Sequence, residues 1–249
     1  MNPNIYAPIF GLFLLFFINS NIDNLNIYKL ILTIVSLYSI IIMQSRGVII
    51  SSIISSTYII IHILISRITR IKFSFKKATF IIIGTCLLAS LTINITYNLY
   101  NKTAIEYASI TEGHLNTSIG QRIQMLLIAK DLIADKPIIG HGSDFKQQKD
   151  RIIIKNNYSK SIKSYKTLHN VYTDSWAKLG ILGLLVAIYL TLLPYLILRK
   201  TNKYYFGITL SIFTLLVSIV DTALLGGEYL LVLLCISYIY KLNQNKIIK

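Results

Sequence analysis

Two arginines and one histidine have the residue types and positions that anion binding and proton transfer require. Arg122 is expected in the first turn of an amphipathic helix, where a bound anion would offset its unfavourable interaction with the positive end of the helix dipole. Arg46 begins an apolar run, and because guanidinium groups bind phosphate through paired N–H donors, the two arginines together suit a diphosphate. His169 lies where the chain returns to an apolar run, and a neutral imidazole there can act as a general base towards a hydroxyl.

Each of these residues also has a purely structural interpretation. Arg46 at a membrane–water boundary can serve as an interfacial anchor, Arg122 can be a solvated surface charge, and His169 can be a packed side chain. The carboxylates form no DxD or HExxH pattern, so the sequence predicts no metal site. Five further residues are candidates for lining the same pocket: Gly140, His141, Gly142, Asn170 and Tyr172.

Composition indicates an integral membrane protein. Of the 249 residues, 54% are hydrophobic and 14% are charged, whereas soluble domains carry about 25% charged residues. The 25 Lys and Arg residues against 10 Asp and Glu give a net charge of +15, which alone would suggest a nucleic-acid partner. Most basic residues lie in short gaps between apolar runs, however, where they set topology and attract anionic headgroups. We therefore expect membrane lipid, and no nucleic acid, as a partner.

We predict an all-α fold: a polytopic helical membrane protein with seven spans and one large helical loop. The apolar runs are longer than the roughly four to eight residues of a typical strand. Four spans lie in residues 1–95, the loop that carries the proposed site is 96–178, and three spans lie in 179–249. The predicted spans are Ile5–Asn19, Tyr28–Met43, Gly47–Ser66, Ala78–Ile95, Leu179–Leu198, Tyr204–Ala223 and Tyr229–Tyr240.

The basic residues of the short loops predict the orientation. Three basic segments, Arg67–Lys77, Arg199–Lys203 and the tail from Lys241, fall on one side of a seven-span chain. The positive-inside rule makes that side cytoplasmic. The large loop then lies on the outer face, because long loops are translocated largely regardless of their charge.

Within the large loop, local signals predict one helix and one turn. Ser118, with a glutamine three residues later, fits a capping box, and the helix should end at Lys136 because the residue before a proline is disfavoured in helical geometry. Two glycines in Pro137–Gly142 allow a tight turn. We expect the Lys-rich stretch Asp144–Thr167 to be mobile and a helix to resume near Leu168.

Several short segments follow one another in an order that is more specific than any one of them. They are Ser45-Arg46-Gly47 at a span start, Gln121-Arg122 opening a loop helix, Pro137-x-x-Gly140-x-Gly142, His169-Asn170-x-Tyr172, and Gly180-Ile181-Leu182-Gly183. With these segments the sequence resembles the C-terminal portion of the O-antigen ligase and O-antigen polymerase (Wzy-type) superfamily of bacterial membrane glycosyltransferases.

The resemblance implies an enzyme that moves glycan from undecaprenyl diphosphate to an acceptor hydroxyl on the periplasmic face of the bacterial inner membrane. It implies that Arg46 and Arg122 bind the diphosphate of the lipid-linked glycan and that His169 activates the acceptor. In a ligase of lipopolysaccharide biosynthesis the acceptor is lipid A–core, and in a polymerase it is another glycan. The inverting reaction of this superfamily needs no metal, and no cofactor is expected.

Three alternatives remain open from the sequence. A repeat-unit polymerase shares these segments with a ligase. The large loop follows the fourth span here, so the first spans of the superfamily would be missing, which is expected of a truncated non-catalytic remnant or of a partner subunit. A lipid-linked glycan transporter is less favoured, because the chain has no repeated halves with broken helices.

Overall fold

Over the residues that the computed structural model describes, which are 3–23, 26–68, 97 and 100–247, every regular element is helical. This confirms the all-α prediction for the described part of the chain. Residues 100–111 are helical. Three short 3-10 helices are η1 (Gly142–Asp144), η2 (Lys160–Ser164) and η3 (Ala223–Leu225). The α-helices are α1 (Pro3–Asp23), α2 (Ile27–Ile42), α3 (Arg46–Ile68), α5 (Ser118–Asp135), α6 (Phe145–Lys155), α7 (Val171–Leu198), α8 (Tyr204–Val220) and α9 (Gly227–Ile247).

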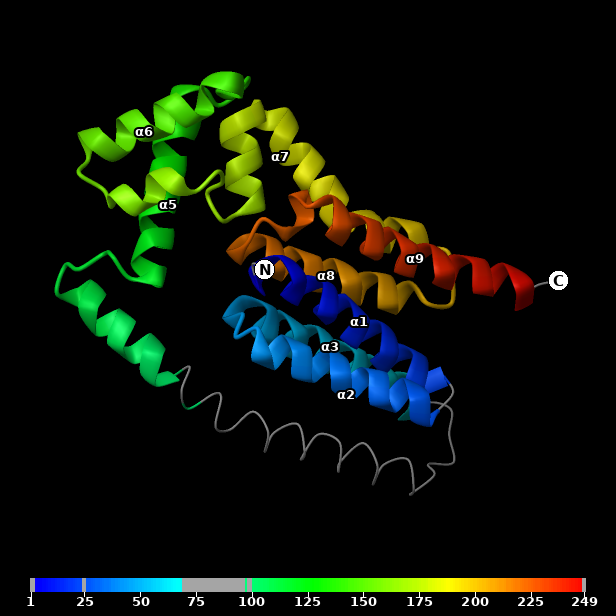
Figure 1. The fold of residues 1–249 in the computed structure, drawn as a ribbon. Helices are drawn as coiled ribbons and strands as arrows, with labels where there is room; N and C mark the ends of the chain where they lie inside the picture. Colours follow the sequence, from blue (N-terminus) through cyan, green and yellow to red (C-terminus); the bar gives the residue numbers. More distant parts are fainter. Residues whose placement is uncertain (1–2, 24–25, 69–96, 98–99, 248–249) are drawn as a thin grey trace.

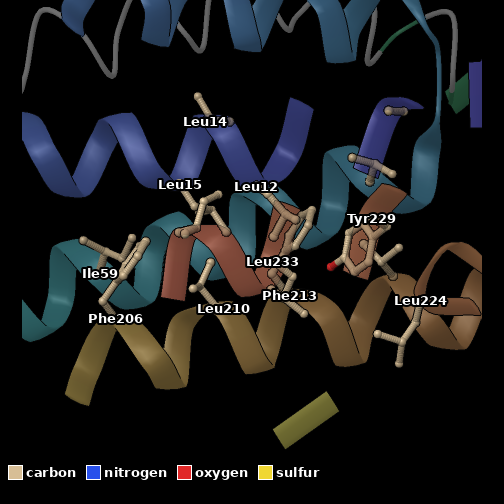
Figure 2. Packing of buried hydrophobic residues seen from close by; sticks show 14 of the residues in the cluster. Leu12, Leu14, Leu15, Ile59, Phe206, Leu210, Phe213, Leu224, Tyr229 and Leu233 are labelled. Carbon is tan, nitrogen blue, oxygen red and sulfur yellow. The ribbon is translucent and has the colours of Figure 1, made fainter. Parts of the chain in front are cut away.

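One bundle contains α1, α2, α3, α8, α9 and the second half of α7 (Figure 1). These helices are apolar on most of their surface, and such helices must be buried in protein or in lipid. The core lies between α1, α3, α8 and α9 (Figure 2). Its completely buried side chains include Leu12, Leu15, Phe206, Phe213 and Leu233.

A second, smaller core lies beside the bundle, between α5, α6, η2 and the first half of α7 (Figure 1). Along α6, Phe145, Lys149 and Ile153 recur every four residues and bury one face of the helix. The expectation of a mobile segment over Asp144–Thr167 is therefore wrong. The many lysines of this stretch conceal an amphipathic pattern, and Ile162 of η2 is also completely buried in this core.

Both ends of α5 follow local rules, with one difference from the prediction. Thr117 caps the helix, because its backbone is extended and its hydroxyl accepts a hydrogen bond from the N–H of Gly120 at 3.1 Å. Ser118 is already the first helical residue, so the predicted capping box is wrong: the preceding threonine is equally suited to the cap position. The predicted end at Lys136, before Pro137, is confirmed.

The helix α7 begins at Val171, slightly later than predicted, because Asn170 occupies its cap position, and it is broken at Gly180. At the break the N–H of Ile181 donates to the carbonyl oxygen of Ile138, in the turn after α5, at 3.1 Å. Gly180 has φ 67° and ψ −157°, and a β-carbon there would lie 1.9 Å from that oxygen. Only glycine fits this position without displacement of the turn.

Among the described helices, one, Val171–Leu198, is long and apolar enough to cross a membrane. Shorter apolar stretches of 10–17 residues lie in α1, α2, α3 and α8. The predicted span Ala78–Ile95 lies outside the described residues, so the count of seven spans stays a prediction. The domain boundary expected between residues 178 and 179 falls close to the break in α7, and the boundary expected after residue 95 lies outside the described residues.

The break predicts a large difference between two glycine substitutions. Gly142 also has a positive φ, of 52°, but a β-carbon there would meet nothing within 4 Å. We expect Gly142→Ala to cost roughly 1 kcal/mol through backbone strain alone, and Gly180→Ala to cost several times as much. Thermal unfolding in detergent measures both. Equal shifts of the unfolding midpoint would show that the contact with Ile138 contributes nothing.

Candidate functional site

The guanidinium of Arg46, the first residue of α3, is held by the helical residues 100–111. It donates to Oε1 of Glu106 at 2.8 Å and to Oγ1 of Thr103 at 3.0 Å. The side chains of Arg46 and Glu106 keep 27% and 10% of their surface exposed. The pair is therefore less screened by water than a surface ion pair, and it uses only part of the guanidinium's set of N–H donors.

Glu106 also binds the N-terminus of α5. Its second oxygen, Oε2, accepts a hydrogen bond from the N–H of Ile119 at 3.2 Å. The N–H groups of a first helical turn lack helical partners and carry a positive partial charge, so they attract a carboxylate. Arg122 lies one turn further along α5, and no hydrogen bond or ion pair joins it to another described residue. One carboxylate thus connects the two helices that carry the arginines.

His169 lies in the turn before α7 and has a left-handed backbone, with φ 52°. Such a conformation costs a non-glycine residue about 1 kcal/mol or more and is often found at functional sites. Its Nδ1 lies 3.8 Å from Oδ1 of Asp221, at the end of α8, and is buried without a hydrogen-bond partner among the described residues. The ring of Tyr165 packs edge-on against the imidazole, with 4.9 Å between centroids.

The turn of His169 and the start of α3 both contact the C-terminal end of α8. The side-chain amide of Asn170 donates to the carbonyl oxygen of Ile219 at 3.1 Å. Gly47, the second residue of α3, packs so closely that a β-carbon there would lie 2.3 Å from Cγ2 of Val220. The histidine and the arginine that begins α3 therefore share one corner of the bundle.

Tyr165 connects this corner to α5. Its hydroxyl donates to Oε1 of Gln121, the residue before Arg122, at 3.3 Å, and its ring is the one that contacts His169. The Nε2 amide of Gln121 also donates to Oγ of Ser161 at 3.0 Å. The structure thus joins the elements that carry the three sequence-predicted residues by direct contacts.

A buried lysine holds the segment that leads into His169. Lys149 of α6 is 1% exposed, and its Nζ donates to the carbonyl oxygen of Ile162 at 3.3 Å and to that of Tyr165. Desolvation by burial lowers the pKa of Lys149, because an ammonium group loses hydration that the two carbonyl groups replace only in part. Lys149 therefore fixes the backbone of the tyrosine that contacts the histidine.

A charged pair in α7 fixes the same segment from the other side. Asp174 is completely buried and accepts hydrogen bonds from the N–H of Leu168 at 2.9 Å and from Nζ of Lys178 at 2.7 Å. Lys178 also donates to the carbonyl oxygen of Lys166 at 3.3 Å. These contacts hold the residue directly before His169 and help to maintain its unusual backbone.

Two of the predicted pocket residues, Gly140 and His141, lie at the break in α7. The N–H of His141 donates to the carbonyl oxygen of Ala177 at 2.9 Å, and its Nε2 lies 2.9 Å from the carbonyl oxygen of Leu132. The first half of α7 rises roughly 13 Å between this turn and the turn of His169. The structure therefore does not bring these two residues next to the histidine.

The other three pocket candidates also have contacts or surroundings of their own. Asn170 caps α7, the hydroxyl of Tyr172 lies 2.9 Å from that of Thr191, and Gly142 is exposed. A pocket-lining role for all five candidates stays a prediction. No group of three or more His, Cys, Asp or Glu residues in the described part of the chain is placed to hold a metal, and the expected metal independence also stays a prediction.

Glu106, Tyr165 and Asp221 belong to this site, although sequence reasoning did not select them. The contact between Arg46 and Glu106 spans 60 residues of sequence, so local patterns carry no information about it. Asp221 did leave a signal, because a carboxylate inside the predicted span Tyr204–Ala223 is costly unless it has a function or a partner. The scarcity of acidic residues, 10 in the whole chain, makes each buried carboxylate conspicuous.

Comparison with known proteins identifies the family. The family model described as O-antigen ligase matches residues 31–188, more than half of the chain. The chain belongs to the O-antigen ligase family. The matched range includes Arg46, Arg122 and His169 and ends before Asp221. The match confirms the resemblance of the sequence to the C-terminal portion of this superfamily, and the O-antigen ligase family is a family of membrane proteins.

A relative in Haemophilus influenzae (strain ATCC 51907 / DSM 11121 / KW20 / Rd), named only "Uncharacterized protein", is 31% identical over 99 residues. The aligned stretch is 39% of this chain and 24% of the relative. This chain thus matches about a quarter of that protein's length.

The buried lysine predicts a loss of stability that charge alone does not explain. Replacement of Lys149 by methionine keeps most of the side-chain volume but removes the ammonium donor from the carbonyl oxygen of Tyr165 and from that of Ile162, which still accepts from the N–H of Tyr165. The loss should cost about 2 kcal/mol. Thermal unfolding and limited proteolysis in detergent measure the effect. Lys146→Met, at an exposed position of the same helix, is the matched control. Equal effects of the two substitutions would contradict the role of the buried donor.

Proposed function

We propose that this member of the O-antigen ligase family is a glycosyltransferase that moves glycan from undecaprenyl diphosphate to an acceptor hydroxyl, and that it acts as a ligase with lipid A–core as acceptor. The proposed reaction takes place on the periplasmic face of the bacterial inner membrane. The observation that carries the proposal is that Glu106 and Tyr165 join the elements bearing Arg46, Arg122 and His169. All five residues lie within the range that matches the family.

In the proposed mechanism the two arginines bind the diphosphate of the donor. Arg46 is oriented by Glu106, and the N–H groups that remain on its guanidinium can bind phosphate oxygens. Arg122 adds a second positive charge one turn inside α5. Negative charge grows on the diphosphate as the bond to the sugar breaks, and fixed positive groups stabilise that charge in the transition state.

His169 is proposed to act as the base towards the acceptor. Its Nδ1 lies 3.8 Å from Oδ1 of Asp221, and the carboxylate favours a proton on Nδ1, which leaves Nε2 as the nitrogen that accepts a proton. Nε2 takes the proton of the acceptor hydroxyl while the hydroxyl oxygen forms a bond to the anomeric carbon. The carbon–oxygen bond to the diphosphate breaks in the same step, and undecaprenyl diphosphate leaves with the electron pair. Attack opposite the leaving group inverts the anomeric configuration.

Substitution of His169 by alanine tests the base directly. Loss of a general base typically lowers a rate by about 10²–10⁴-fold, so lipopolysaccharide in a deletion strain that carries His169→Ala should lack O-antigen. His114→Ala, an exposed histidine that we place outside the site, is the matched control and should restore wild-type ladders. Wild-type ladders from His169→Ala at normal protein levels would rule out this base.

Asp221→Asn tests the orientation of the imidazole. Asparagine keeps the shape of the side chain but cannot stabilise a positive imidazole, so transfer should fall without a loss of folded protein. The decrease should be smaller than that of His169→Ala, and the double variant should be no worse than His169→Ala alone. Additive effects measured with purified membranes and lipid-linked donor would show that Asp221 acts independently.

The products that accumulate in a deletion strain distinguish a ligase from a repeat-unit polymerase. A ligase defect should leave uncapped lipid A–core together with polymer that stays on its lipid carrier. A polymerase defect should instead leave a single repeat unit on the core. Gel analysis of lipopolysaccharide and mass spectrometry of the lipid-linked fraction separate these outcomes, and an unchanged pattern would contradict both.

A further inference from the structure

The turn that connects α5 to η1 exposes a run of apolar residues. Ile138 is 72% exposed and Ile139 is 74% exposed, and Pro137 before them is exposed as well. Three consecutive exposed apolar residues are unusual on a surface that faces water, and they typically mark an interaction. We therefore expect an apolar partner for this turn.

The same turn adjoins the outward-facing side of the spanning half of α7. The carbonyl of Ile138 accepts from the N–H of Ile181, and on either side of this contact Leu179 is 62% exposed and Leu182 is 69% exposed. Exposed apolar residues continue down the helix at helical spacing: Leu185, Val186 and Tyr189. A helix that crosses the membrane presents such a stripe to lipid, so the two isoleucines lie at the end of a lipid-facing surface.

An amphipathic ring lies beside the turn. The indole N–H of Trp176 donates to the carbonyl oxygen of Pro137 at 2.9 Å. Tryptophan is enriched at the membrane–water interface, where its apolar ring and its polar N–H suit the headgroup level. The position of Trp176 agrees with lipid, rather than a second protein surface, as the apolar partner of the isoleucines.

The turn is also held rigidly. A β-carbon at Gly140 would lie 2.5 Å from the backbone nitrogen of Gly180, and His141 is fixed by its contacts with Ala177 and Leu132. A rigid apolar projection loses little conformational entropy when it enters lipid, because its backbone is already ordered. The backbone next to the exposed isoleucines is therefore held against the first half of α7.

We propose that the Pro137–Ile139 turn inserts Ile138 and Ile139 into the adjacent leaflet of the membrane as a monotopic anchor. The anchor attaches α5 and α6 to the membrane directly, in addition to their links to the bundle through Glu106 and α7, and it sets the height of the second core above the lipid. Interfacial anchors of this type combine a small buried apolar surface with flanking polar groups. The proposal depends on membrane insertion of α7 and not on the proposed glycan transfer.

Spin labels at single cysteines test the insertion. The full chain, with Cys86→Ser and Cys235→Ser, is labelled at Ile138→Cys or Ile139→Cys and reconstituted into vesicles of phosphatidylethanolamine and phosphatidylglycerol. Collisions with oxygen, which concentrates in lipid, and with a water-soluble nickel chelate are then compared. The oxygen-to-nickel ratio at both positions should be several-fold higher than at Ile154→Cys, an isoleucine of α6 that is 67% exposed. It should approach the ratio at Leu185→Cys.

Two results would overturn the proposal. Labels at 138 and 139 that respond like the label at 154 would place the turn in water. Labels that neither reagent reaches would mean that another protein surface covers the turn. Because these side chains are exposed, the variants should unfold at the same temperature as the parent chain, which circular dichroism in detergent verifies. The measurement needs no enzymatic turnover, so its failure would leave the proposed function untouched.

Discussion

The hydrogen bond from Ile181 to the carbonyl oxygen of Ile138 determines how the rest of the chain is arranged. It bends α7 at Gly180, so that one half of the helix packs against α5 and the other half joins the bundle. As one straight helix of 28 residues, α7 would extend roughly 42 Å and would carry its N-terminal turn away from α8. The half after the break rises roughly 27 Å, close to the roughly 25 Å of α8. The bent first half then brings the turn of His169 to the end of α8, where Asn170 contacts Ile219.

A few carboxylates then join parts that the apolar cores leave separate. Glu106 links α3 to the N-terminus of α5, Asp174 binds the segment before His169, and Asp221 faces the imidazole. Each of them is partly or fully shielded from water. Away from water an ionic contact is stronger than on the surface, but a charged group there must have a partner. In a chain with 10 acidic residues and a net charge of +15, these three carboxylates have an organising role that the more numerous lysines do not share. Lys149 and Lys178 are exceptions, because both bind backbone carbonyl groups of the segment that leads into His169.

Local rules account for much of the fold. Apolar runs longer than strands predicted helices, the proline after Lys136 predicted the end of α5, and glycines predicted a turn after it. Such rules failed where two neighbours were equally suited to one role, as with Thr117 and Ser118. They also failed over Asp144–Thr167, because net charge there suggested solvation, while every fourth residue of α6, Phe145, Lys149 and Ile153, lies on a buried face.

The sequence alone determined the membrane class, the helical fold and the family. These depend on composition, on the length of apolar runs and on short segments that can be recognised without knowledge of their contacts in the fold. It also selected two arginines and a histidine by their chemistry. Only the tertiary structure decided that Glu106 pairs with Arg46 and that Asp221 faces His169. It also placed Gly140 and His141 at the break in α7, and not beside His169 as predicted. The physical reason is range: a contact across 60 residues depends on how helices pack, and no local pattern encodes packing between distant helices.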